Sequence, residues 1–204
     1  MAFFARKTDE IIVEIGSYLG MSTVFMAKAT NNKIYAIDPH YLKSYKKFLA
    51  NTKKYKNIIP VRKTSAAANI DWKLPIALLH IDGNHKYKYA KQDLKIWLPF
   101  LKKDGVVVCH DAFAPFPEVW QAVKEELFDK NFGYVGINDS QIFAIKNGKR
   151  NFQRNFIILA SEIWHQETIP YPIRDFIVKR ILKPFYLNRL MLQFFVQSRL
   201  LKKD

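Results

Sequence analysis

Short apolar runs recur along the first 110 residues of the chain, and amphipathic segments separate them. Each run is rich in valine, isoleucine and leucine, a pattern typical of strands that are buried on both faces of a parallel sheet. Five such runs are present, at 11–15, 33–37, 58–61, 75–81 and 106–109. The other segments carry apolar residues at helical spacing and predict helices at 22–30, 39–54, 87–101 and 118–128. Ser22 or Thr23 could cap the first helix, and the segment 65–68 suits either a strand end or a helix start.

The alternation of strands and helices decides the fold class. Five strand–helix units precede two further apolar segments, 132–137 and 141–145, which three turn-forming residues connect. Repeated units of this kind are typical of an open α/β sheet with helices on both faces, and the last two segments predict an antiparallel hairpin. We therefore expect a doubly wound, mostly parallel α/β domain at residues 1–149, with a C-terminal hairpin, followed by a helical extension at 150–204.

Polar side chains gather where the predicted strands end. They are Glu14, Asp38, Asp82, His85, His110 and Asp111. Open α/β sheets bind ligands outside the carboxyl ends of their parallel strands, where neighbouring strand ends meet. The sequence therefore predicts a single binding site built from these residues. His80, inside the fourth strand, is expected to be a satisfied core histidine, and Asp93 a solvated residue of the helix 87–101.

A glycine-bearing turn follows the first strand and indicates which nucleotide could bind. Gly16 and Gly20 let the backbone approach a ligand closely, and Asp38 lies 22 residues after Gly16, where a carboxylate can accept hydrogen bonds from ribose hydroxyls. A dinucleotide-binding turn needs glycine at its third and sixth positions, which here hold Tyr18 and Met21. S-adenosylmethionine contains ribose and adenine without phosphates, so it suits this turn better. Two ordinary turn glycines would give the same pattern.

Composition and charge narrow the class of protein. A chain of 204 residues with 49% hydrophobic residues is long enough to bury one sizeable core. Its single cysteine, Cys109, and the absence of a signal-peptide pattern or a membrane-spanning apolar run predict a cytoplasmic protein. The net charge of +15 predicts an acidic partner, which could be nucleic acid, anionic lipid, or a phosphorylated or carboxylated substrate.

Three segments resemble those of class I, Rossmann-like S-adenosylmethionine-dependent methyltransferases. They are VEIGSYLGMST, IYAIDPH and HIDGNHKYKYAKQDLKIWLPFLKKDGVVVCHD. The chain is most similar to the branch with macrocin-type sugar O-methyltransferases and cephalosporin-hydroxylase-like proteins, over residues 10–146. The resemblance implies S-adenosylmethionine as the cofactor. The cofactor-binding residues that it implies are Glu14, Gly16, Ser17 and Gly20 at the methionine end, Asp38 at the ribose, Ser65 near the adenine, and Tyr18 and Asp82 beside them.

Relatives in this branch often carry a divalent metal at the substrate end, and the resemblance implies Asp82, His110 and Asp111 as its ligands. The branch commonly has a carboxylate at the position of His110 and an acid, often proposed as the base, at the position of Asn84. Oxygen ligands alone would favour Mg²⁺, whereas an imidazole ligand favours Mn²⁺, Fe²⁺ or Zn²⁺.

The predicted catalytic residues are His85, Asp82 and His110. His85 is the predicted base, because an imidazole titrates near neutral pH. The alternatives are that His85 caps the following helix and that His110 is structural.

The extension at 150–204 lies outside the resemblance. Its segment 155–163 is apolar and suits a short helix or strand, and 173–201 combines bulky apolar residues with basic ones around Pro184. Such a segment can fold over the core as a lid, form a homodimer interface, or lie on an anionic membrane surface.

The leading functional hypothesis is O-methylation of a sugar, glycan or other small hydroxylated metabolite. Because the chain is positively charged, this acceptor could be anionic. Methyl transfer from a sulfonium needs positioning of the nucleophile and removal of its proton. A second hypothesis is nucleic-acid methylation or binding, suggested by the +15 charge, although the sequence contains no recognisable RNA-binding module. A third is a noncatalytic, membrane-associated protein with the same fold.

Overall fold

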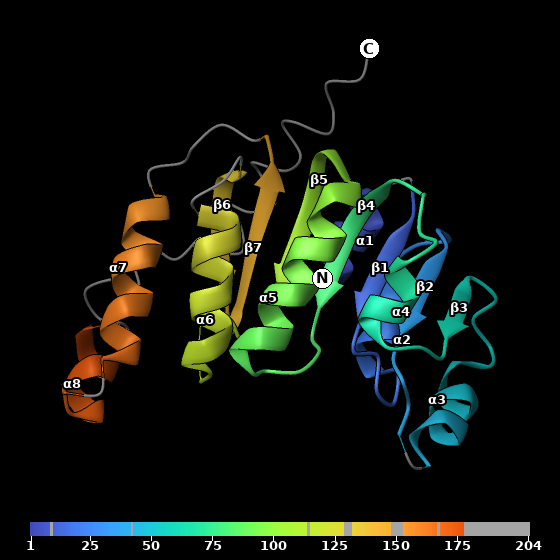
Figure 1. Cartoon of the computed structure of the whole chain (residues 1–204), viewed down its shortest axis with the longest axis horizontal. Helices are drawn as coiled ribbons and strands as arrows, with labels where there is room; N and C mark the ends of the chain where they lie inside the picture. The colour runs from blue at the N-terminus through green and yellow to red at the C-terminus, as the bar shows by residue number, and fades with distance from the viewer. Residues whose placement is uncertain are drawn as a thin grey trace.

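A computed structural model describes residues 1–8, 10–41, 43–113, 115–128, 132–147, 153–166 and 168–177. Within them, seven strands form one sheet in the order β3-β2-β1-β4-β5-β7-β6 (Figure 1). The strands are β1 (Ile12–Ile15), β2 (Ile34–Ile37), β3 (Ile58–Val61), β4 (Ile76–Ile81), β5 (Leu101–Cys109), β6 (Phe132–Asn138) and β7 (Gln141–Lys146). β1 to β5 pair in parallel, whereas β7 pairs antiparallel with both β5 and β6. The predicted doubly wound, mostly parallel α/β fold with a closing antiparallel hairpin is confirmed.

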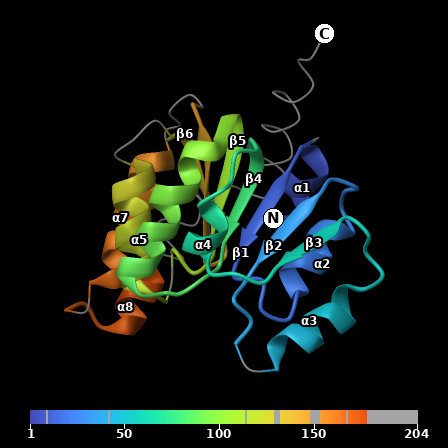
Figure 2. The same ribbon diagram turned by 45° about the vertical axis from the view of Figure 1, so that its right-hand side comes forward.

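Helices cover both faces of this sheet, as Figures 1 and 2 show. One face carries α4 (Ser65–Asn69), α5 (Tyr87–Trp97), α6 (Pro117–Val123) and α7 (Gln153–His165), and the other carries α1 (Ala2–Lys7), α2 (Met21–Ala27) and α3 (Ser44–Thr52). Successive strand residues point to opposite faces. Leu79 and Val107 therefore pack with α5 and α6, while their neighbours Leu78 and Val108 pack with α1 and α2. This burial on both faces explains the continuously apolar strands of the sequence.

Several element boundaries differ from the predicted ones for local physical reasons. The helix expected at 39–54 begins only at Ser44, and the helix expected to reach residue 101 ends in a 3₁₀ turn, η1 (Leu98–Phe100). β5 then starts at Leu101 rather than at residue 106, because Asp104 lies inside the strand as an irregularity. Asp104 has a φ of 60° there, and the pairing of β5 with β4 shifts beside it. The helix expected at 118–128 consists of α6 and a π-helical turn, η2 (Lys124–Phe128).

The first part of the predicted extension packs on the sheet. α7 contacts β6, and its residues Ile157 and Ala160 are buried in the same core as α5 and α6. α8 (Tyr171–Phe176) follows it. The segment around Pro184 lies outside the described residues, so the division of the chain at residue 149 stays a prediction. In the part of the chain that the structure describes, no helix is both long and apolar enough to cross a membrane.

Candidate active site

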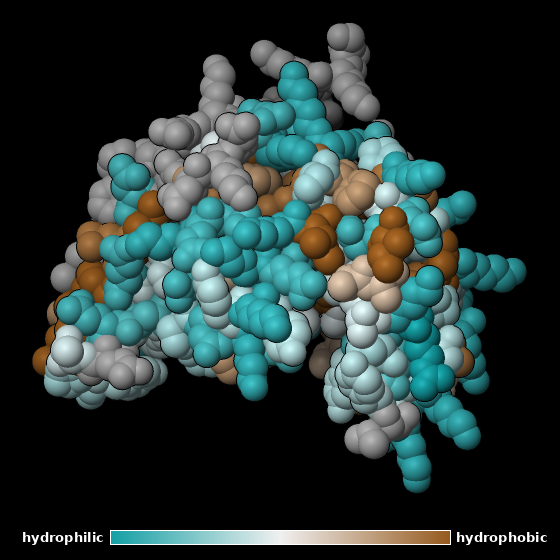
Figure 3. Space-filling view, viewed as in Figure 1, coloured by the Kyte–Doolittle hydropathy of each residue, from teal (hydrophilic) through white to brown (hydrophobic). Residues whose placement is uncertain are grey.

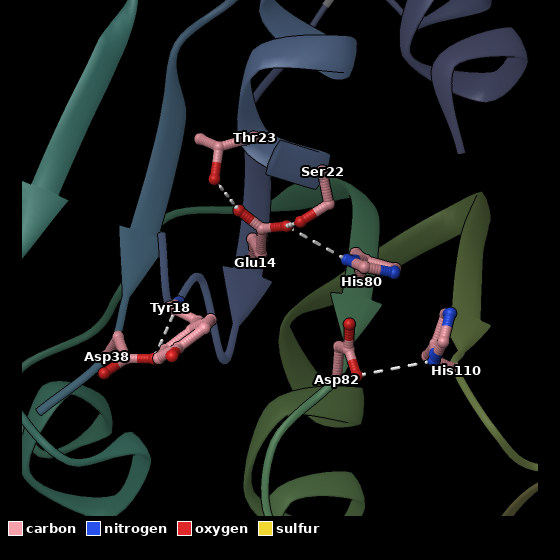
Figure 4. A network of polar contacts seen from close by, with 8 residues as sticks. All are labelled: Glu14, Tyr18, Ser22, Thr23, Asp38, His80, Asp82 and His110. Atoms are coloured by element: carbon pink, nitrogen blue, oxygen red, sulfur yellow. Dashed lines mark hydrogen bonds and ion pairs between the residues drawn. The ribbon is translucent and has the colours of Figure 1, made fainter. Parts of the chain in front are cut away.

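The carboxyl ends of four parallel strands lie side by side at one edge of the sheet. The strands end in register at Ile37, Ile15, Ile81 and Cys109. The residues that come next in the chain are, in the same order, Asp38, Gly16, Asp82 and His110. The register of the sheet therefore brings the predicted site residues to one edge, as the fold class requires. Figure 4 shows Asp38, Asp82 and His110 at these strand ends, with the loop that follows β1 between them.

The loop after β1 depends on glycine where it passes the end of β4. Gly16 has a φ of +86°, and a Cβ atom built on it would lie 2.0 Å from the carbonyl oxygen of Asp82. The loop therefore touches the backbone of Asp82 directly. Tyr18 also has a positive φ, of 41°, and its side chain is 65% exposed, so its ring does not fill the space beside Gly16. The hydroxyl of Ser17 is buried and has no hydrogen-bond partner among the described residues, which leaves it available to a bound molecule.

Asp38 orients the same loop from the end of β2. Its carboxylate accepts hydrogen bonds from the backbone N–H of Tyr18 at 2.9 Å and of His40 at 2.6 Å. Burial lowers the pKa of His40, against the opposing effect of Asp38 itself. A lowered pKa favours the neutral form of the His40 imidazole. Because each carboxylate oxygen can accept more than one hydrogen bond, Asp38 keeps capacity for ribose hydroxyls.

Glu14 has a different position from the predicted one. It is fully buried, the hydroxyls of Ser22 and Thr23 donate to its two oxygens, and Nδ1 of His80 lies 3.2 Å from Oε1 (Figure 4). Its carboxylate therefore holds the start of α2 and the strand β4 from inside the core. The two hydroxyls are occupied by Glu14 and do not cap α2, which begins at Met21 after a left-handed Gly20. His80 is a buried core residue, as predicted, but only its Nδ1 has a partner, and its buried Nε2 has none among the described residues.

Two carboxylates and two imidazoles meet at the ends of β4 and β5. Nδ1 of His110 lies 3.5 Å from Asp82 and 3.1 Å from Asp111, and Nε2 of His85 lies 3.3 Å from Asp111. The structure thus brings together all three predicted metal ligands and adds His85 to them. Asp82, His85 and Asp111 each offer a ligand atom, and these three atoms lie within 4.8 Å of one another.

The environment of this cluster suits a divalent cation. Burial raises the pKa of the Asp82 carboxyl, although His110 and His80 act in the opposite direction. Nε2 of His85 and Nδ1 of His110 are buried and form no hydrogen bond among the described residues. A cation bound between the carboxylates would compensate for their burial and accept a lone pair from an imidazole. The mixture of oxygen and nitrogen donors fits Mn²⁺, Fe²⁺ or Zn²⁺ better than Mg²⁺.

An open pocket of about 560 Å³ adjoins the cluster. It is lined by Asn84, His85, Lys86, Phe116, Pro117 and Glu118. The ring of Phe116 stacks on that of His85, with centroids 4.1 Å apart and an angle of 6° between the planes. This stacking fixes the imidazole of His85 between the pocket and Asp111. The sequence alone does not indicate Phe116, because a residue in a proline-flanked loop carries no periodic signal.

Ser65 is part of a buried cluster beneath the loop that follows β4. Its hydroxyl accepts a hydrogen bond from Nε1 of Trp97 at 2.8 Å and interacts with the carboxyl of Asp93. Asp93 is only 7% exposed, so the prediction that it is solvated is wrong: Asp93 and Trp97 are four residues apart and share the inner face of α5. Ser65 itself is half-buried, and its predicted contact with adenine stays a prediction.

Burial of Asp93 predicts a pH-dependent stability. Burial raises its pKa from 3.8 to about 6, against the hydrogen bond to Ser65. Between these values the folded chain keeps a proton that the unfolded chain has lost, so stability falls as the pH rises from about 4 to about 6 and is constant above. Asp93→Asn removes this ionisation. We expect it to raise the free energy of unfolding at pH 7.5 by about 1–3 kcal/mol, and to raise it much less near pH 4.

Urea denaturation at several pH values measures this effect. Asp71→Asn, which changes an exposed acid just after α4, is the control and should leave the stability nearly unchanged at each pH. An Asp93→Asn protein that is less stable than the unaltered chain at pH 7.5 would show that the ionised carboxylate is stabilised by its surroundings.

Comparison with known proteins agrees with the geometry of this edge. Residues 13–112 match the family model of a methyltransferase domain. The matched segment runs from β1 to the residues just after β5, and it contains Asp38, the loop around Gly16 and the carboxylate–imidazole cluster. The ligand-binding edge of the sheet therefore lies within the matched segment.

Solved structures of methyltransferases share the fold of this domain. An rRNA methylase from Streptococcus thermophilus is 14% identical, with a TM-score of 0.56, and the match covers 72% of this chain and 94% of that chain. A methyltransferase from Podospora anserina, bound to SAH, is 20% identical, with a TM-score of 0.58 and coverage of 71% and 75%. A SAM-dependent O-methyltransferase from Thermotoga maritima is 15% identical, with a TM-score of 0.55 and coverage of 73% and 63%. At these identities the likeness establishes the Rossmann-like methyltransferase fold alone.

Proposed function

We propose that the protein is an S-adenosylmethionine-dependent O-methyltransferase that acts on a hydroxyl group of a sugar, glycan or other small hydroxylated metabolite. The observation that carries this proposal is the single row of strand ends, in which Asp38, Gly16 and Asp82 are adjacent. A ribose-binding carboxylate, an open glycine loop and a proton-accepting cluster then line one site. The match of residues 13–112 to a methyltransferase domain supports the reaction class.

The cofactor side of the site consists of the loop after β1 and the end of β2. Asp38 would accept the ribose hydroxyls, because its carboxylate already accepts a hydrogen bond from the loop and keeps further acceptor capacity. The buried, unpartnered hydroxyl of Ser17 would bind a polar group of the methionine portion. S-adenosylmethionine supplies an electrophilic methyl group, and the chain supplies its orientation toward Asp82.

The acceptor side consists of the pocket next to His85. The exposed part of the Phe116 ring offers an apolar surface on which the C–H face of a sugar ring can pack. Lys86 and Glu118 provide polar groups at the rim for hydroxyls or for an acidic substituent. An acceptor hydroxyl placed against Asp111 would lie between the pocket and the cofactor loop. The apolar face and polar rim favour a small hydroxylated ring over a flat nucleobase alone.

Asp82, His85 and Asp111 would hold the divalent metal, and His110 would accept the proton of the acceptor hydroxyl. The stacked Phe116 fixes His85 in the three-residue ligand group, which supports His85 as a ligand rather than as the predicted base. Nδ1 of His110 lies 3.5 Å from Asp82 and 3.1 Å from Asp111, and these contacts hold the imidazole at the edge of the cluster. A bound divalent cation lowers the pKa of a coordinated hydroxyl and so eases its deprotonation.

A transfer assay with labelled S-adenosylmethionine tests the proposal. Protein freed of metal by chelation is assayed on a panel of sugars and glycans, with and without added Mn²⁺ or Mg²⁺. We expect transfer to at least one hydroxylated acceptor, reduced about tenfold or more without metal. His85→Gln should raise the metal concentration needed for half-maximal activity about tenfold, whereas His110→Gln should lower kcat.

Two outcomes would overturn parts of this account. Full activity in metal-free protein would show that the reaction needs no metal. The proposed role of His85 as a metal ligand would then be wrong as well. Transfer to RNA but to none of the hydroxylated small molecules would assign the nucleic-acid reaction instead, the activity class of the rRNA methylase that shares the fold.

A further inference from the structure

The segment between residues 39 and 70 carries a net charge of +8, about half of the +15 of the whole chain. Between residues 39 and 70 there are seven lysines and one arginine, and no aspartate or glutamate. Six of these lysines lie on α3 and the segments that flank it: Lys43, Lys46, Lys47, Lys53, Lys54 and Lys56. All six are exposed. The lysine ion pairs of the described residues are made by Lys91, Lys102 and Lys124, outside this segment. The six charges are therefore not compensated by described carboxylates.

Exposed apolar side chains lie beside these lysines. Met21 and Phe25, one helical turn apart on α2, are 75% and 54% exposed, and Tyr41, just before α3, is 73% exposed. Leu49 of α3 is 39% exposed. The two helices contact each other and lie side by side in Figures 1 and 2, and the side-chain amide of Asn51 on α3 donates to the carbonyl of Leu19 just before α2. In Figure 3 the surface over α3, at the lower right, is mainly hydrophilic. We call this corner, with its six lysines and four apolar residues, the α2–α3 face.

We propose that the α2–α3 face binds the surface of an anionic lipid membrane. Lysines attract the negative headgroup layer, and methionine, phenylalanine, leucine and tyrosine side chains enter the boundary between headgroups and acyl chains. A second copy of the chain is disfavoured as the partner, because a symmetric contact would bring six lysines against six lysines.

RNA fits the same face less well. Seven of the eight basic residues are lysines, whereas phosphate-backbone recognition favours the planar guanidinium of arginine. The one arginine, Arg62, lies over the ring of Tyr45 with its Cζ atom 5.1 Å from the ring centre. The exposed Met21 and Leu49 also have no role in contacting phosphates. The combination of lysines and aliphatic side chains is therefore the one expected at a lipid interface.

This face lies next to the cofactor loop, since a Cβ atom on Gly20 would contact Thr52 and Phe48 of α3. Membrane binding through it would hold the strand-end site close to the headgroup layer. An acceptor attached to a lipid would then be presented to the pocket at high local concentration.

Sedimentation with vesicles tests the proposal on the full chain. The vesicles are phosphatidylcholine alone, or phosphatidylcholine with about 30% phosphatidylglycerol. The unaltered protein should sediment with the anionic vesicles and much less with the neutral ones. Lys43→Gln/Lys46→Gln/Lys47→Gln should lower the partition coefficient on the order of 100-fold, at about fivefold per lysine. The control Lys73→Gln/Lys88→Gln/Lys95→Gln removes the same charge from exposed positions elsewhere and should change it less than about threefold.

A second variant separates a lipid surface from a purely electrostatic partner. Phe25→Ser/Leu49→Ser keeps every charge and should weaken vesicle binding at high salt, where charges are screened, while leaving the anisotropy of a labelled single-stranded RNA unchanged. Vesicle binding that is absent in the unaltered protein, or equal in the two triple variants, overturns the proposal. If Lys43→Gln/Lys46→Gln/Lys47→Gln loses RNA binding but keeps vesicle binding, the α2–α3 face binds RNA instead. Neither the vesicle assay nor the RNA assay uses S-adenosylmethionine. The outcomes of both assays are therefore independent of the methyl-transfer proposal.

Discussion

Gly16→Ala is expected to lower the free energy of unfolding by about 3–5 kcal/mol, the largest loss of stability that we expect from a single methyl group in this chain. The new Cβ atom would lie 2.0 Å from the carbonyl oxygen and 2.6 Å from the carbonyl carbon of Asp82. Both are backbone atoms at the end of a central strand, so neither can rotate away. The φ of +86° at this position adds about 1–2 kcal/mol of strain for any residue with a side chain.

Gly83→Ala is the matched control, because it also adds one methyl group, at the residue that follows Asp82 in the chain. Its Cβ atom would lie 3.1 Å from a side-chain oxygen of Asp93 and 3.5 Å from a methyl group of Ile15, both on side chains. We expect a loss of about 1 kcal/mol. Urea denaturation of the two variants gives the comparison. Equal stabilities would mean that the loop after β1 does not press on the end of β4 as described.

Asp38→Ala is expected to weaken the binding of S-adenosylmethionine about 100-fold or more. The substitution removes a charged acceptor that would bind two ribose hydroxyls, and each such hydrogen bond contributes about 1.5–3 kcal/mol. It also removes the contacts that hold the backbone N–H groups of Tyr18 and His40. Calorimetric titration gives the affinity, and Asp71→Ala serves as the acidic control at an exposed position. An Asp38→Ala protein that binds within about threefold of the unaltered chain would assign the ribose to other residues.

Much of the fold follows directly from the apolar pattern. Five apolar runs became five parallel strands, as is typical of strands buried on both faces. The central strands β1 and β4 are fully buried, whereas the edge strand β3 is only partly buried. Their polar ends then share one edge, since the register Ile37, Ile15, Ile81, Cys109 leaves no alternative. Boundaries were less predictable. β5 starts at Leu101 rather than at residue 106, because pairing with β4 continues past a local irregularity that no sequence period reveals.

The roles of individual polar residues depend on partners that are distant in sequence. Glu14 is expected at the methionine end of the cofactor, yet within the protein it contacts Ser22, Thr23 and His80, the last of which lies 66 residues away. The apolar pattern of a strand shows that a residue lies near the end of that strand. It does not show which other elements will cover the side chain of that residue. The predicted cluster of Asp82, His110 and Asp111 does come together, because its members follow adjacent strands. His85 and Phe116 join it through loops, whose course only the tertiary structure specifies.

Titration of S-adenosylmethionine into the unaltered chain, followed by calorimetry, tests the central claim most directly. If the strand ends of β1, β2 and β4 form a cofactor site, the protein will bind one equivalent saturably, and Asp38→Ala will bind far more weakly while remaining folded. Absence of any binding heat at about 100 µM ligand, with the protein folded, would contradict the assignment of this edge to methyl transfer.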